Sequence, residues 1–169
     1  VTEAFGTVAA ELGPVDILVD NARIDPYLRP ADMGDADWWD ATLAVNLKGA
    51  YLCAMAAWDG MKARGWGRIV HVSSKAASDP RTKQAAYAVA KMAVVTLTTA
   101  IAAEVKGSGV TANVILPSVI DTPENRATLS KSDPAKWVPP ERIAALMGFL
   151  CSEEGVSING AAIPVYGAV

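Results

Sequence analysis

The chain has 169 residues, of which 51% are hydrophobic and 20% are charged, and its formal net charge is −3. This composition predicts one packed globular domain over residues 1–169 and excludes a disordered chain. The fifteen lysines and arginines are scattered along the chain, so we expect no nucleic-acid partner.

Charges and glycines interrupt every apolar run before it reaches 18 residues, and the N-terminus lacks a basic segment followed by an apolar one. We therefore predict no membrane partner and a cytoplasmic protein, with Cys53 and Cys151 as free thiols. The single histidine, His71, has no Cys or His at metal-ligand spacing, so we predict no metal site. A hydrogen-bonded strand position is the expected role of His71.

The first half of the chain predicts a helix, a strand and a long second helix. Residues 1–12 carry apolar side chains at helical spacing and end at Gly13-Pro14. Residues 15–19, VDILV, are short and apolar, which is typical of a strand buried in a parallel sheet. Asp35 or Asp37 is expected to cap the long helix at 36–64, which Gly65 and Gly67 end.

The second half continues the alternation of strands and helices. Strands are predicted at 67–74, 110–117 and 161–166, with a helix at 82–106, a loop from Thr122 to Pro140 and a last helix starting at the proline pair. Four strands that alternate with helices predict an α/β fold with a doubly wound, Rossmann-like parallel sheet.

Polar residues follow the predicted strands, and ligands bind beyond the carboxyl ends of such strands. Ser74 ends one strand, and the next helix carries Tyr87 and Lys91 four residues apart, on the same face. A phenol has a pKa near 10, and a neighbouring ammonium is expected to lower it toward the range of a general acid or base. The Ser74 hydroxyl could polarise a substrate carbonyl.

The Tyr87–Lys91 spacing is weak evidence by itself. A lysine four residues after a tyrosine occurs by chance in roughly one chain out of four or five, so a surface pair in an alanine-rich helix is the alternative interpretation.

A resemblance across the whole chain favours the chemical interpretation. The segments GPVDILVDNAR, WDATLAVNLKGAYL, GRIVHVSS, YAVAK and VTANVILPSVIDTP resemble, in order and spacing, motifs of the short-chain dehydrogenases/reductases. The resemblance implies hydride transfer between NAD or NADP and a small-molecule secondary alcohol or ketone.

The same resemblance implies a role for each matching residue. Tyr87 would exchange the substrate proton, Lys91 would lower the pKa of Tyr87 and hold the ribose, Ser74 would orient the carbonyl, and Asn46 would sustain a water relay. The residues expected to contact the cofactor are Asn21, Ala22, Tyr87, Lys91, Pro117, Ile120 and Thr122. The alternatives are a backbone-bonded helix amide for Asn46 and a turn before Pro123 for Thr122.

Several departures from the family pattern accompany the resemblance. The sequence contains no glycine-rich TGxxxGxG turn, so we expect the chain to be the C-terminal part of the family fold, lacking its first strands and helices. Strand 15–19 would then be an exposed edge that is prone to aggregation. Asp20 stands where a neutral amide is usual, and Arg23 stands where the family has glycine.

Two functions from different classes follow. The first is an NAD(P)-dependent oxidoreductase with Tyr87 as general acid/base. The second is a non-catalytic remnant of the family that acts as an oligomerisation or binding partner. The helices at 36–64 and 82–106 resemble the family's oligomer-forming helices, so a homo-oligomer is expected.

Overall fold

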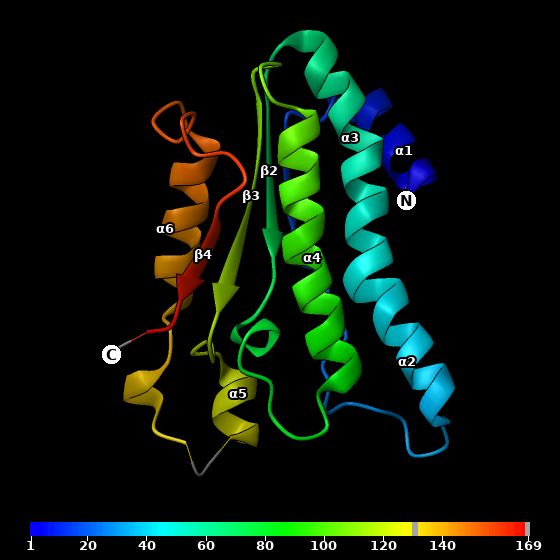
Figure 1. Ribbon diagram of the computed structural model, residues 1–169, viewed down its shortest axis with the longest axis vertical. Coiled ribbons are helices and arrows are strands. Elements are labelled where there is room, and N and C mark those ends of the chain that lie inside the picture. Colours follow the sequence, from blue (N-terminus) through cyan, green and yellow to red (C-terminus); the bar gives the residue numbers. More distant parts are fainter. Residues whose placement is uncertain (130–131, 168–169) are drawn as a thin grey trace.

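The computed structural model describes residues 1–129 and 132–167, and it confirms the predicted α/β fold. The described residues form one parallel sheet with the strand order β1-β2-β3-β4 (Figure 1). The strands are β1 (Ile17–Asp20), β2 (Gly67–Val72), β3 (Val110–Pro117) and β4 (Ala162–Val165). All four end at the same side of the sheet, as a parallel arrangement requires.

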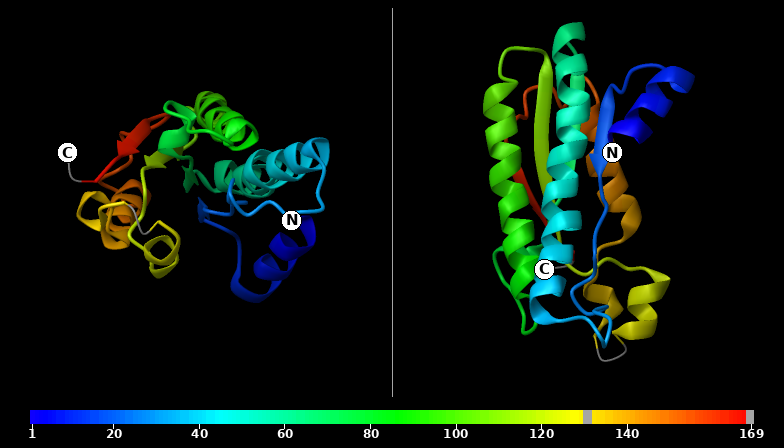
Figure 2. Two further views of the ribbon diagram at one scale, coloured as in Figure 1. Left: turned by 90° about the horizontal axis from the view of Figure 1, so that it is seen from below. Right: turned by 90° about the vertical axis from the view of Figure 1, so that its right-hand side faces the viewer.

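Helices cover both faces of this sheet. The α-helices are α1 (Thr2–Leu12), α2 (Asp35–Leu43), α3 (Ala50–Arg64), α4 (Ala85–Glu104), α5 (Pro123–Thr128) and α6 (Pro140–Cys151). Figure 2 shows α3 and α4 on one face and α6 on the opposite face. The sheet is therefore the middle layer of a three-layer sandwich, as a doubly wound fold demands.

Each face of the sheet has its own apolar core. Ile69 of β2 and Ala112 of β3 pack against Met61 of α3 and Ile101 of α4. On the opposite face, Val70 and Ile115 pack against Ile143 and Leu150 of α6. Because successive residues of a strand point to opposite faces and both faces are covered, the apolar residues of β2 and β3 are not confined to alternate positions. Each strand also buries two polar side chains, Arg68 and His71 in β2 and Thr111 and Asn113 in β3.

The helix α4 is long and apolar enough to cross a membrane by composition alone. It carries the buried Lys91 and packs lengthwise on β3, and its apolar side belongs to the core clusters. Burial against the sheet therefore accounts for its composition.

The predicted long helix at 36–64 is correct in position but wrong in regularity. Residues Ala44–Gly49 between α2 and α3 form a π-helical segment, and Asn46 lies within it. The predicted cap is also wrong: Gly34 occupies the N-cap position, while Asp35 and Asp37 lie in the first turn, where carboxylates stabilise the positive end of the helix dipole.

The segment predicted as a loop from Thr122 to Pro140 contains more structure than expected. Its described residues include α5 and a 3₁₀ turn at Pro134–Lys136, each starting at a proline after a capping side chain. A proline at the first helical position and a hydroxyl or carboxylate before it are sufficient to start such short helices.

Strand β1 forms an edge of the sheet. Among the described strands it pairs with β2 alone, and Ile17 and Val19 are 47% and 43% exposed. The predicted apolar edge is thus present in this chain, whereas its tendency to aggregate stays a prediction.

Candidate functional site

The candidate site lies at the carboxyl ends of β1, β2 and β3, at the lower end of the sheet in Figure 1. Asp20 ends β1, Val72 ends β2 and Pro117 ends β3. The N-terminal part of α4, which follows β2 after the turn at Lys75–Ala77, brings Tyr87 and Lys91 to this end. The structure thus gathers the predicted residues from segments that are far apart in the sequence.

Tyr87 and Lys91 lie together, as the helical spacing predicted. The Lys91 Nζ atom is 5.8 Å from the centre of the Tyr87 ring, and the two residues are 3% and 8% exposed, respectively. Lys91 Nζ donates a hydrogen bond of 2.8 Å to the carbonyl oxygen of Val72, and Ser73 Oγ donates one of 2.7 Å to the Lys91 carbonyl. These bonds fix α4 against the end of β2.

Ser74 lies beside the same pair. Its backbone is extended, and its Oγ accepts a hydrogen bond of 3.1 Å from the Ala76 amide, which caps the following 3₁₀ turn. The Ser74 side chain also interacts with the Tyr87 hydroxyl and lowers its pKa. A serine hydroxyl has one proton, so Ser74 can donate it either to the Tyr87 oxygen or, once a ligand is bound, to that ligand.

The protonation of the pair differs from the prediction. Burial raises the pKa of Tyr87 above its ordinary value, and the opposing contributions come from a hydrogen bond with Ser74 and from the charge of Arg23. Burial also lowers the pKa of Lys91 to about 8, while Asp20 raises it and Arg23 lowers it. The pKa of Tyr87 is therefore raised where a lowered value was expected, because burial outweighs the hydrogen bond and the charges around the phenol. The effect of Lys91 on this pKa stays a prediction.

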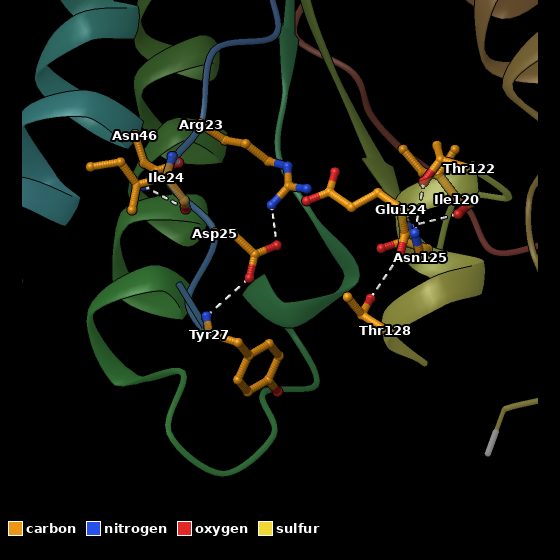
Figure 3. A network of polar contacts seen from close by, with 10 residues as sticks. All are labelled: Arg23, Ile24, Asp25, Tyr27, Asn46, Ile120, Thr122, Glu124, Asn125 and Thr128. Atoms are coloured by element: carbon orange, nitrogen blue, oxygen red, sulfur yellow. Dashed lines mark hydrogen bonds and ion pairs between the residues drawn. The ribbon is translucent and has the colours of Figure 1, made fainter. Parts of the chain in front are cut away.

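Asn46 makes backbone hydrogen bonds from the π-helical segment. Its Oδ1 accepts from the Ile24 amide at 3.3 Å, and its Nδ2 donates to the carbonyl oxygens of Ile24 and Thr42 at 3.3 and 3.1 Å (Figure 3). Asn46 therefore clamps the loop after β1 onto the helix. This geometry is the backbone-bonded alternative, and the water relay stays a prediction. π-Helical segments are frequent at functional sites.

The residues predicted to hold the nicotinamide end follow β1 and β3. Asn21 and Ala22 come directly after Asp20. Pro117 is the last residue of β3, and Ile120 and Thr122 follow the strand. Thr122 Oγ1 caps α5 by accepting from the Asn125 amide at 3.2 Å. Asn125 Nδ2 donates to the Ile120 carbonyl at 2.7 Å, so this turn is rigid (Figure 3). Contact with a cofactor remains a prediction for these residues.

Two features of the site were missed from the sequence. One is the ion pair of Arg23 with Asp25, whose other oxygen accepts from the Tyr27 amide at 2.9 Å. The other is a cavity of about 640 Å³ that Tyr87 shares with Tyr27, Trp38 and Trp39. The cluster of aromatic residues within 27–39 was a usable signal for the second feature, since large aromatic side chains commonly line ligand pockets.

Comparison with known proteins identifies the class. Residues 1–133 match the model of the short chain dehydrogenase family. The chain is 36% identical over 176 residues to D-threitol dehydrogenase of Mycolicibacterium smegmatis, covering 99% of this chain and 67% of that protein. It is 34% identical over 174 residues to acetoacetyl-CoA reductase of Shinella zoogloeoides, covering 98% and 72%.

A plant relative shows a similar likeness over a smaller share of its length. The NADPH-dependent aldehyde reductase-like chloroplastic protein of Arabidopsis thaliana is 38% identical over 165 residues, which cover 91% of this chain and 61% of that protein. The parallel sheet, the clustered Ser74, Tyr87 and Lys91, and these matches have one explanation: the chain belongs to the short-chain dehydrogenase/reductase family of oxidoreductases.

Proposed function

We propose that this chain supplies the proton-transfer part of an NAD(P)-dependent oxidoreductase that interconverts a secondary alcohol and a ketone. The observation that carries the proposal is the convergence of Ser74, Tyr87 and Lys91 at the carboxyl ends of the strands. Two of these groups are buried, and a hydrogen bond is electrostatically stronger in such surroundings than in water.

In this proposal each side chain acts at a stated atom of the substrate. Tyr87 gives its hydroxyl proton to the carbonyl oxygen during reduction and takes it back during oxidation. Ser74 Oγ donates a hydrogen bond to the same oxygen, where negative charge develops. The nicotinamide, when bound, supplies or accepts the hydride at the carbonyl carbon. Proton and hydride together balance the reduction.

The donor set suits the nicotinamide end of NAD or NADP. The Lys91 ammonium has three protons and uses one on the Val72 carbonyl, so further donors remain for ribose hydroxyls. Asn21, Ala22, Pro117, Ile120 and Thr122 would surround the nicotinamide at the same end of the sheet. The two free thiols, Cys53 and Cys151, support the proposal of a cytoplasmic protein.

The test is a turnover assay that follows NADH and NADPH absorbance. D-Threitol and acetoacetyl-CoA, which the names of two relatives suggest, are the first substrates to try. We expect Tyr87→Phe to lower kcat by roughly 100-fold or more, the effect of removing a general acid. Tyr51→Phe, at an exposed position of α3, is the matched control and should leave turnover unchanged. Full activity of Tyr87→Phe would refute the proposed mechanism.

The second candidate function is a binding or assembly role without catalysis, and an exposed apolar surface favours it. Leu52 of α3 and Val89 and Met92 of α4 are each 39–49% exposed on the layer that faces away from α6. We propose that this surface associates with a second copy of the chain. Light scattering after size exclusion should give a dimer mass that Val89→Asp with Met92→Asp reduces to the monomer. A monomer in the unmodified chain would refute the assembly.

A further inference from the structure

The cavity beside Tyr87 has a wall of aromatic side chains. Its volume is about 640 Å³, which lies within the range of small-molecule sites in proteins. Trp38 and Trp39 line it from α2, and Tyr27 lines it from the loop after β1. Figure 3 shows the Tyr27 ring on the side of this loop away from Arg23. Tyr27 is 54% exposed and Trp39 is 39% exposed, so part of this flat apolar surface is open to a ligand.

Three charged side chains also line the cavity, and two of them neutralise each other. Arg29 forms an ion pair with Asp35, and its Nε donates a hydrogen bond of 3.0 Å to the Met33 carbonyl oxygen. The guanidinium is thereby engaged within its own loop. Lys83 is the third charged group, and it forms no ion pair with any residue that the structure describes. The wall therefore has one net positive charge, and the ammonium of Lys83 carries it.

Lys83 occupies the wall through an unusual backbone conformation. Among the residues that the structure describes, it is the one non-glycine residue with a positive φ, at 63°. A residue with a Cβ is disfavoured in this left-handed region and persists there where the surrounding structure holds it. The Arg81 amide donates a hydrogen bond of 2.8 Å to Gln84 Oε1, which closes the turn across Lys83 directly before α4. This turn sets Lys83 beside Ala85 and Ala86, which line the same cavity.

We propose that this cavity binds the substrate and that the substrate is a flat, apolar molecule with a carboxylate that Lys83 recognises. The aromatic side chains stack on its apolar body, and the Lys83 ammonium donates a charge-assisted hydrogen bond to its carboxylate. The first turn of α4 adds the positive end of a helix dipole beside the same group. Because Tyr87 is part of the wall, a ketone held in this way lies beside the proposed proton donor.

The proposal deepens the proposed function and rests on it in one respect, namely that the molecule in the cavity is the substrate. Lys83 is then the residue that determines specificity for the charge of the substrate. Its position does not depend on whether the chain turns a substrate over.

The charges of the wall argue against a cationic substrate. Aromatic faces attract cations, but the Lys83 ammonium and the positive end of α4 would repel one. The single carboxylate that lines the cavity, that of Asp35, is already paired with Arg29. The wall therefore offers a cation no free partner, whereas it offers an anion one.

The experiment compares the binding of two matched probes to the whole chain by NMR of its ¹⁵N-labelled tryptophan side chains. 4-Acetylbenzoate is a flat aryl ketone with a carboxylate, and 4-acetylbenzamide is its neutral counterpart. The indole signals of Trp38 and Trp39, assigned with Trp38→Phe and Trp39→Phe, should shift as 4-acetylbenzoate is added. The signal of Trp66, which precedes β2 at the opposite end of the sheet, should not shift. We expect the carboxylate to bind roughly fivefold more tightly than the amide, the upper range for one solvent-exposed ion pair.

A charge-removing variant assigns this preference to Lys83. Lys83→Gln should weaken the binding of 4-acetylbenzoate by roughly fivefold and leave the binding of 4-acetylbenzamide unchanged. Lys62→Gln, which removes a cation near the far end of α3, is the control and should keep the preference. Circular dichroism shows whether each variant is folded. Should Lys83→Gln unfold, the unmodified chain still decides, because added NaCl should weaken the binding of the carboxylate and not that of the amide.

Three results would each overturn the proposal: equal affinity of the two probes for the unmodified chain, no shift of the Trp38 and Trp39 signals, or an undiminished preference in folded Lys83→Gln. The binding test needs neither nicotinamide nor turnover, so it is separate from the test of the proposed function. A preference for the carboxylate without turnover would count against the proposed function alone. Turnover without this preference would count against the substrate class alone.

Discussion

The central and edge strands of this sheet have similar apolar sequences and different surroundings. Strands β2 and β3 are buried along almost their whole length, whereas β1 and β4 alternate exposed and half-buried positions. A central strand has a neighbour on each side and a helix layer on each face, whereas β1 lacks a described neighbour on one side. The number of neighbours, and not the composition of the strand, therefore decides its burial.

The ends of the central strand β2 and of the edge strand β1 also contribute different groups to the candidate site. The end of β2 holds Lys91 by a backbone carbonyl inside the buried region. The end of β1 carries Asp20 and, after the turn, Arg23 at the less covered edge. The buried backbone contact to Lys91 thus comes from a central strand, whereas the charged side chains of Asp20 and Arg23 lie at the end of an edge strand and in the turn after it.

The largest expected effect is on core packing. Ile115 of β3 is fully buried against α6, so Ile115→Ala should lower the free energy of unfolding by about 2–5 kcal/mol. Ile17→Ala makes the same change on β1, where the side chain is about half exposed, and should cost less than about 1 kcal/mol. Urea denaturation measures both. Equal losses would show that β1 is as well buried as β3.

Burial of His71 on β2 should make stability depend on pH. The pKa of His71 in the folded chain is about 4, below the ordinary value of 6.5. Between pH 4 and pH 6.5 the histidine is therefore protonated in the unfolded chain and neutral in the folded chain. The contribution of His71 is complete above pH 6.5 and is lost as pH falls toward 4, amounting to about 3 kcal/mol.

The check is the slope of unfolding free energy against pH between 4 and 6.5. His71→Asn should flatten that slope, whatever its effect on absolute stability at pH 7. An unchanged slope in the variant would mean that another group titrates in this range. The hydrogen bond of His71 Nδ1 with Thr98 Oγ1, at 2.9 Å, confirms the predicted strand position.

An effect of similar size to that of His71 is expected at the turn that leads into β3. Gly107 and Gly109 both have positive φ, but a Cβ at Gly109 would lie 1.9 Å from the carbonyl oxygen of Gly65, while one at Gly107 would meet nothing within 4 Å. Gly107→Ala should cost about 1 kcal/mol of backbone strain, and Gly109→Ala about 2 kcal/mol more. Thermal denaturation of the two variants compares them. Similar losses of stability in the two variants would mean that the backbone at Gly65 shifts to make room for the new Cβ at little energetic cost.

The smallest effect on stability is expected at the edge strand β1. A measurable effect on aggregation is expected there as well. Val19→Lys places a charge on exposed β1 and should change the free energy of unfolding by less than about 0.5 kcal/mol. It should delay the onset of light scattering on heating, because a charge on an edge strand opposes strand addition. Val8→Lys on α1 adds the same charge away from the edge, and an equal delay there would attribute the effect to net charge.

Much of the site could be predicted because its determinants are local. The four-residue spacing of Tyr87 and Lys91 places them on one helix face wherever the helix lies, and a serine at the end of a parallel strand must lie at the ligand-binding edge. The order of strands and helices followed from periodicity in the same way. The π-helical segment around Asn46 could not be predicted, since its amide bonds depend on a loop 22 residues away.

The sequence by itself determined the elements, their order and the identity of the chemical groups at the strand ends. The tertiary structure decided the protonation of those groups, because it buried Tyr87 and Lys91 so deeply that the pKa of Tyr87 is raised where a lowered value was expected. The physical reason is that helix and strand formation follow from neighbouring residues, whereas desolvation and charge interactions depend on every segment that packs around a group.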